Sequence, residues 1–187
     1  MFKIIALFGP SGSGKDTLLN HIIKKYPNQF NKIISYTTRP IRENEKNGED
    51  YFFISAENFT KRVISGTMLE ATQWGGEFYG SDISEFDQTK INIGIFDEHG
   101  IECLLGNSDL DIIPIFIAAE DKTRLLRILN REQSPDCEKI CKRFLEDKTR
   151  FNVEFPFEYK IYYNGNKISF ELFENALEEL GVLSKNN

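Results

Sequence analysis

A glycine-rich segment near the N-terminus constrains the fold of this chain more than any other stretch. Its residues are Gly9, Pro10, Ser11, Gly12, Ser13, Gly14, Lys15, Asp16 and Thr17. An apolar run at residues 4–8 precedes it, and apolar residues at helical spacing follow it from Leu18 to Tyr26, before Pro27. A strand, a glycine-rich turn and a helix in this order are the setting of a phosphate-binding loop, or P-loop. We therefore expect an α/β fold in which this loop binds the phosphates of a nucleotide.

The residue types of the P-loop suit an anion. Glycine lets the backbone curl until successive N–H groups point at one anion, and the next helix adds the partial positive charge of its N-terminus. Lys15 supplies a full charge that can bridge the outer phosphates. A hydroxyl residue is expected directly after this lysine to bind Mg²⁺, but Asp16 stands there and the hydroxyl comes at Thr17. Both are candidate metal ligands, Asp16 directly or through water.

Composition limits the class of protein. The chain has 187 residues, 40% of them hydrophobic and 28% charged, which fits one soluble domain with a buried core. No apolar run is long enough to cross a bilayer, and the first residues lead straight into a core strand, so we expect a cytoplasmic protein without a signal peptide or membrane contact. The net charge of −6 argues against nucleic-acid binding and favours a small anionic ligand for the local clusters of arginine and lysine.

Cysteine and histidine are too few for a metal cluster. Cys103, Cys137 and Cys141 cannot all pair, so we expect reduced thiols. His21 is expected to be an ordinary residue of the first helix.

Apolar runs of strand length alternate with helical patterns along the chain. Strands are expected at residues 4–8, 32–34, 91–96, 112–117 and 159–163, and an amphipathic closing helix runs from Phe170 to Leu180. This order predicts a three-layer P-loop fold with a parallel sheet of five strands, and with ligands at the C-terminal ends of the strands. Pro114 conflicts mildly with the fourth strand and is tolerable at an edge or an irregularity.

Two inserts are expected within this single domain. Residues 35–84 predict a small β-rich lobe, with a strand near 50–54, a helix at 57–65, and a hairpin that turns at Gly75 and Gly76. Residues 124–150 predict a lid of two charged helices joined near residues 133–136. The core is left with residues 1–34, 85–123 and 151–187.

A second candidate anion site lies in the first insert. Arg39 and Arg42 are three residues apart in a polar loop, and two guanidinium groups can bind one phosphate bidentately. Taken alone, a pair of solvated surface charges is an equally good interpretation. Phosphoryl transfer needs such charge neutralisation and alignment more than covalent chemistry.

The chain resembles the guanylate kinase family over nearly its whole length. The residues that carry the resemblance are 9–15, Ser35 to Arg42, Glu45, Gly48, Asp50, Tyr51, Phe53, Leu69, Glu70, Tyr79, Gly80 and Ser81. The group from Ser35 to Phe53 is far more specific than a P-loop alone. The resemblance implies an enzyme that uses ATP and Mg²⁺ to phosphorylate GMP, and dGMP, to the diphosphate.

The resemblance also implies roles for single residues. Those that match the site for the GMP phosphate are Arg39, Arg42, Tyr51 and Tyr79, and Glu45 belongs to the same substrate-binding set. Those that match contacts to the guanine base are Ser35, Glu70 and Ser81, with Asp97 near the acceptor nucleoside. Guanine offers adjacent donors at N1 and N2 that one carboxylate can accept together, whereas adenine lacks this pair.

The second insert matches the family in its arginines. Arg127, Arg131 and Arg143 match lid and phosphate-clamping residues, so the implied catalytic residues are Lys15, Arg39, Arg131 and Arg143, with Arg127 on the ATP side. Arg124 is expected only to solvate its helix, and Arg150 has no secure match. A solvated helical face is the alternative for all of these arginines.

Four positions depart from the family pattern. Asp16 replaces the hydroxyl residue of the P-loop, and Ile95 replaces the first aspartate of an Asp-x-Asp pair that ends at Asp97. His99 replaces the glutamine of a Gln-Gly pair, and Asn44 replaces a glycine of the phosphate loop. These positions bear on the acceptor and on the metal.

Two other functions fit the same scaffold. Ribose bisphosphokinases of phosphonate pathways resemble guanylate kinases and can carry Gly-Lys-Asp in the P-loop, but this chain keeps the set that faces guanine. Guanylate-kinase-like domains of scaffold proteins bind phosphopeptides without catalysis, but they normally have degraded P-loops within longer chains. The expected partners are small nucleotides, in a monomer or a homodimer, with no nucleic acid and no membrane.

Overall fold

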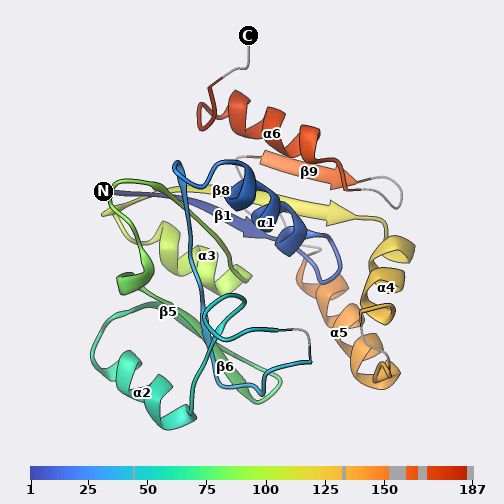
Figure 1. Ribbon diagram of the computed structural model, residues 1–187. Helices are drawn as coiled ribbons and strands as arrows, with labels where there is room; N and C mark the ends of the chain where they lie inside the picture. Colours follow the sequence, from blue (N-terminus) through green and yellow to red (C-terminus); the bar gives the residue numbers. More distant parts are fainter. Residues whose placement is uncertain (44, 132–133, 152–158, 164–167, 185–187) are drawn as a thin grey trace. The chain divides into compact units, whose positions relative to one another are not determined.

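The computed structural model describes residues 1–43, 45–131, 134–151, 159–163 and 168–184 (Figure 1). By their internal contacts the residues form two compact units. The first unit consists of Met1–Ala6 and Tyr26–Ile113, and the second of Leu7–Lys25 and Pro114–Asn187. The division into a core, a lobe and a lid stays a prediction.

The larger sheet has five strands in the order β2-β7-β1-β8-β9. Its strands are β1 (Phe2–Phe8), β2 (Phe30–Lys32), β7 (Ile91–Ile95), β8 (Leu110–Ala119) and β9 (Tyr159–Tyr163). β2 pairs with β7, and β8 with β9, in parallel. Every residue from Ile4 to Phe8 is fully buried, so both faces of β1 are covered, as a central parallel strand requires. The predicted α/β class and five-stranded parallel sheet are confirmed.

Two strands differ in detail from the prediction. Pro114 lies inside β8, which is an interior strand and not an edge. Within the described residues, the pairing of β8 with β9 runs from Ile115 to Ala119. β2 begins and ends two residues earlier than expected, although Ile33 still donates its N–H to the carbonyl of Ile93 at 2.9 Å.

The P-loop helix and the closing helix both belong to the second unit. α1 (Lys15–Lys25) ends before Pro27, as predicted, and α6 (Phe170–Glu179) begins after the capping residue Ser169. His21 does more than fill a helix position, because its Nε2 lies 2.6 Å from Glu174 Oε1 and its ring stacks on Phe170 at 4.0 Å. These contacts join α1 to α6.

The first unit contains a second, four-stranded sheet with the order β4-β3-β6-β5. Its elements are β3 (Tyr36–Thr37), β4 (Phe52–Phe53), α2 (Ala56–Ile64), β5 (Met68–Trp74) and β6 (Glu77–Asp82). β5 and β6 form the predicted hairpin, and Gly75 and Gly76 turn it with φ angles of +60° and +86°. Two successive positive φ angles match the twist of the strands and favour glycine at both positions.

The remaining elements are η1 (Ile83–Glu85), α3 (Glu98–Leu105), α4 (Asp121–Leu129) and α5 (Cys137–Arg150). Two helices were expected in the second insert and are confirmed, while the predicted joint between them lies partly outside the described residues, at 132 and 133. All three cysteines are free thiols. Within the described ranges, no helix is both long and apolar enough to span a membrane.

Candidate functional site

The P-loop belongs to the second unit and joins β1 to α1. Gly9 has a φ of +135°, and a Cβ at this position would lie 2.2 Å from the carbonyl oxygen of Ile117. Gly12 has a φ of +76°, and its Cβ would lie 2.6 Å from the carbonyl oxygen of Arg124. Both glycines are therefore required by the backbone angle and by the close approach of another backbone.

Lys15 is folded back onto its own loop. Its Nζ donates to the carbonyl oxygens of Gly9 and Pro10 at 2.7 and 3.0 Å. Removal from water lowers the pKa of this ammonium group to about 8, and the charge of Arg143 lowers it further, against the opposing charges of Asp16 and Asp147. A phosphate would stabilise this ammonium group more strongly than the two carbonyls do.

The structure brings two of the three predicted lid arginines to the P-loop. Arg127 Nη1 donates to the carbonyl oxygens of Gly12 and Ser13 at 3.1 and 3.3 Å. Arg143 lies close enough to Lys15 to affect its pKa. Arg131 is exposed and lies two residues beyond the end of α4. Its assignment as a catalytic residue stays a prediction.

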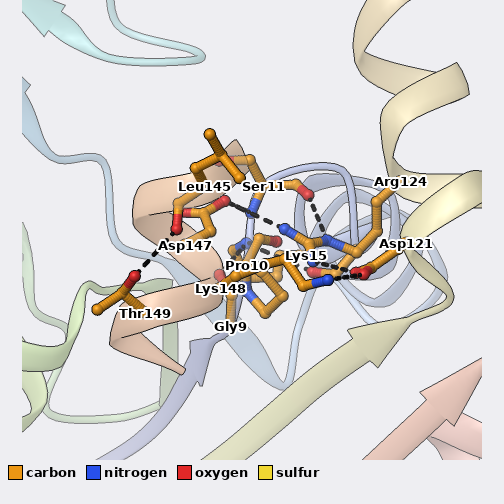
Figure 2. Close-up of polar contacts among 11 residues, drawn as sticks. Gly9, Pro10, Ser11, Lys15, Asp121, Arg124, Leu145, Asp147, Lys148 and Thr149 are labelled. Carbon is orange, nitrogen blue, oxygen red and sulfur yellow. Dashed lines mark hydrogen bonds and ion pairs between the residues drawn. The ribbon is translucent and has the colours of Figure 1, made fainter. Parts of the chain in front are cut away.

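The expectation that Arg124 only solvates its helix is wrong. The residue is 4% exposed, and its guanidinium lies 4.8 Å from the centre of the Phe144 ring. It donates from Nε to the carbonyl of Ser11 at 3.0 Å and from Nη2 to Asp147 Oδ2 at 3.3 Å, as Figure 2 shows. Its Nη1 donates to Asp121 Oδ1 at 3.0 Å.

Sequence reasoning missed Asp147. Its Oδ2 accepts the backbone N–H of Ser11 at 2.7 Å (Figure 2), a contact between residues 136 positions apart. The residue lies in a helix rich in charges of both signs, where no spacing distinguishes it from its neighbours. Only the folded arrangement of the P-loop, α4 and α5 identifies it.

The two candidate Mg²⁺ ligands are exposed in the first turn of α1. Asp16 offers a carboxylate and Thr17 a hydroxyl, and oxygen atoms of these kinds are what Mg²⁺ prefers. In the described part of the chain, no cluster of three or more histidine, cysteine or acidic side chains could hold a metal by itself. The donor set therefore fits a metal that shares its coordination with phosphate and water.

The predicted phosphate-acceptor residues come together in the first unit. Arg39 and Glu45 form two parallel hydrogen bonds of 2.6 Å, with side chains 10% and 9% exposed. Arg42 donates its backbone N–H to Glu45 at 3.0 Å. The Arg39 guanidinium lies 5.1 Å from the centre of the Tyr51 ring, which packs edge-on against Tyr79. Arg39 is therefore not a solvated surface charge.

Charge in this cluster is fixed by pairing. Burial alone would raise the pKa of Glu45, but hydrogen bonds from Arg39 and Arg42 hold it below its usual range. Arg42 is more open, with 35% of its side chain exposed and its Nη1 3.7 Å from Glu45 Oε1. Asn44, which replaces a glycine of the family pattern, lies outside the described residues.

The residues that match the guanine contacts also converge. Ser35 Oγ and Ser81 Oγ are 3.1 Å apart, and Glu70 is opposite Ser81 in the β5–β6 ladder. Glu70 is 8% exposed. Burial, with a smaller contribution from the charge of Asp97, raises the pKa of Glu70 to about 7, although hydrogen bonds from Ser81 oppose the shift.

Asp97 has a structural contact of its own. Its Oδ1 accepts the N–H of Gly100 at 2.8 Å and so caps the N-terminus of α3. A Cβ on Gly100 would lie 3.4 Å from Glu70 Oε2, which places the start of α3 next to that carboxyl. His99 points instead toward Cys103, with 3.6 Å between Nε2 and Sγ.

Comparisons with known proteins identify the family of the chain. The family model "Guanylate kinase" matches residues 1–180. The guanylate kinase of Chlamydia felis (strain Fe/C-56) is 32% identical over 177 residues, which cover 92% of this chain and 86% of that protein. The guanylate kinase of Malacoplasma penetrans (strain HF-2) is 30% identical in an alignment of 189 positions that covers 95% of each chain.

The fold agrees as well. The crystal structure of guanylate kinase from Anaplasma phagocytophilum matches with a TM-score of 0.72 and 21% identity, over 98% of this chain and 88% of that one. At this identity the likeness shows the fold alone, whereas the family model and the sequence relatives show descent. The chain belongs to the guanylate kinase family.

Proposed function

We propose that this protein transfers the γ-phosphate of ATP to GMP, and to dGMP, to give the diphosphate. The observation that carries the proposal is Glu70, a buried carboxyl beside Ser81 with a pKa of about 7. A group with this pKa is ionised in a substantial fraction of molecules at neutral pH and can accept both N1–H and N2–H of guanine. Adenine would leave the carboxylate unpaired.

The acceptor phosphate is proposed to bind Arg39 and Arg42, next to Tyr51 and Tyr79. Arg39 is already oriented by Glu45 and by the ring of Tyr51. Its planar guanidinium suits bidentate contact with a phosphate. The attacking oxygen of a nucleoside monophosphate is anionic near neutral pH, so alignment and charge neutralisation carry the reaction without a general base.

The donor is proposed to be ATP with Mg²⁺. The P-loop amides, Lys15 and Arg127 would hold its outer phosphates, and Arg131 and Arg143 would neutralise the charge of the transferred group. Asp16 and Thr17 would hold Mg²⁺, which would supply positive charge to the phosphates. With the metal bound, the carboxylate of Asp16 would be paired with it and would not repel the phosphates.

We further propose that the protein works in the cytoplasm on small nucleotides, as a monomer or a homodimer. Nucleic acid and membranes are not among its partners. The net charge of −6 supports this, because an acidic chain repels polyanions and anionic surfaces.

The proposal is tested by a coupled assay with ATP, Mg²⁺ and each acceptor in turn. GMP and dGMP should exceed AMP in kcat/KM by roughly 10³ or more, because a mismatched base leaves buried polar groups unpaired. Lys15→Ala should lower kcat about 10²-fold or more by removing charge stabilisation of the transition state. Equal rates with GMP, AMP, CMP and UMP would contradict the proposal. Efficient use of ribose 1,5-bisphosphate would assign the related sugar-phosphate activity instead.

A further inference from the structure

We propose that Asp147 and Arg124 are positioning residues for the P-loop, which act on ATP binding through the backbone of Ser11. The proposal rests on the proposed function only in taking ATP as the donor. Neither residue belongs to the set that the family resemblance implies.

Asp147 and Arg124 enclose one peptide residue in a ring of three hydrogen bonds. Asp147 Oδ2 accepts the Ser11 N–H at 2.7 Å, Arg124 Nε donates to the Ser11 carbonyl at 3.0 Å, and Arg124 Nη2 donates to the same Asp147 oxygen at 3.3 Å. Both backbone groups of Ser11 are thus bound by side chains from two helices. A residue held on both sides cannot rotate its peptide planes independently.

α4 continues this contact along the loop. Arg124 binds the carbonyl of Ser11, and Arg127 Nη1 binds the carbonyls of Gly12 and Ser13. Three successive carbonyls are therefore turned toward arginines of one helix. Because the N–H of a trans peptide points opposite to its C=O, the N–H groups of Gly12 and Gly14 are turned away from α4. Amides turned to one side in this way can receive one anion.

Arg124 and Asp147 are both buried, which limits the groups that can pair with their charges. Arg124 is 4% exposed and Asp147 is 9% exposed, so each charge depends on the other and on Ser11 for its hydrogen bonds. Asp121, the further partner of Arg124, is half-exposed and also pairs with Lys148 at 2.7 Å (Figure 2). Within the described residues, Asp121 makes no hydrogen bond to the P-loop. The pair holds the loop before ATP arrives, so binding does not have to order it.

The test compares Asp147→Ala, Asp147→Asn and Asp121→Asn in the full chain. Asp147→Ala should weaken ATP binding about tenfold, the effect expected for one buried charge-assisted hydrogen bond. Asp147→Asn keeps an oxygen for the Ser11 N–H and should recover part of this loss. Asp121→Asn removes one negative charge from the same arginine without touching Ser11, so ATP affinity should stay within about twofold of wild type.

Affinity for ATP is measured by calorimetry without acceptor, with thermal unfolding as a control for folding. In kinetics, the loss should appear in KM for ATP, while KM for GMP at saturating ATP stays unchanged. A folded Asp147→Ala protein that binds ATP as well as wild type, or more tightly, would overturn the proposal, since the carboxylate would then only compete with phosphate. Should Asp147→Ala fail to fold, Asp147→Asn decides by the same readout.

Two further outcomes distinguish the role of the Ser11 contacts from an effect of charge alone, and the proposal for the P-loop from the proposal for the acceptor. An Asp121→Asn effect as large as that of Asp147→Ala would show that only the charge around Arg124 matters, and would also overturn the proposal. A wild-type protein that binds ATP but does not phosphorylate GMP would contradict the proposed acceptor. The comparison of ATP affinities among the variants would remain valid in that case.

Discussion

Two glutamates of the first unit have side chains that are largely covered, yet their pKa values are shifted in opposite directions. Glu45 is paired with Arg39, which keeps it ionised. Glu70 has no arginine among the groups that shift its pKa and faces the charge of Asp97, so burial raises its pKa to about 7. Glu45 thus orients a cation permanently, whereas Glu70 remains available for a donor that a ligand brings.

The pKa of Glu70 predicts how GMP affinity depends on pH. Guanine donors bind the carboxylate, so below pH 7 the affinity should fall by up to about tenfold per pH unit, and it should level off above about pH 8. Calorimetric titration with GMP between these conditions measures the effect. The phosphate of GMP also titrates, at about pH 6, whichever protein variant binds it. The difference in GMP affinity between wild type and Glu70→Gln therefore isolates the effect of the Glu70 carboxyl. A constant difference across this range would contradict the assigned role.

Protein stability should respond to the same group. The pKa of Glu70 is raised from 4.5 to about 7 in the folded state, so the folded protein binds more protons than the unfolded chain between these values. The contribution of Glu70 to the free energy of unfolding is therefore full at low pH and is lost as pH rises through 7. Glu70→Gln should remove this part of the pH dependence.

At the scale of single elements, sequence pattern predicts what is long or marked by glycine. The β5–β6 hairpin follows from two strand-like runs and the pair Gly75-Gly76. β4 lies within the strand expected near residues 50–54. β3 was not predicted, because its two residues are too few to show alternation and a polar loop follows them. α3 was not predicted, because its eight residues follow Asp97 directly and only Ile101 and Leu104 mark an apolar face.

The cap of α3 allows two roles of Asp97 to be separated. Asp97→Ala removes the acceptor for the Gly100 N–H and should lower the free energy of unfolding by about 1 kcal/mol, whereas Asp97→Asn should keep most of it. Chemical denaturation measures both. If Asp97 also contacts the acceptor nucleoside, Asp97→Asn should raise KM for GMP while stability is preserved. Equal stability of the Ala and Asn variants would show that the cap contributes little.

At the scale of the whole molecule, the sequence predicts the sheet. It does not predict the contacts that α4 and α5 make with the P-loop. Residues 4–8 predict a strand buried on both faces because all five are apolar, and the structure shows them fully buried. The Arg124–Asp147 pair could not be predicted, since it joins two charged helical patterns that look solvated. Long-range pairs of this kind are specified by packing and leave no local periodicity.

Alanine should be tolerated less well at Gly9, between β1 and the P-loop, than at Gly66. Gly9→Ala would place a Cβ 2.2 Å from the Ile117 carbonyl oxygen at a φ of +135°, so the backbone of the loop or of β8 must shift. Gly66→Ala also has a positive φ, +73°, but nothing within 4 Å. Gly66→Ala should cost about 1–2 kcal/mol of stability, and Gly9→Ala clearly more, with loss of ATP binding. Thermal unfolding and calorimetry would show equal effects if the close approach were unimportant.

Glu45 occupies part of the Arg39 guanidinium and leaves the rest for an anion. Two of the five N–H donors bind Glu45 at 2.6 Å and one binds the carbonyl oxygen of Pro40 at 3.0 Å, so the remaining donors can meet a phosphate while Glu45 stays in place. The charge of Glu45 weakens the attraction for an inorganic ion, whereas a nucleotide adds the contacts of its base and sugar. The resting protein can therefore stand in a solution crowded with small ions and keep its receptor unblocked for the rarer molecule that carries a purine.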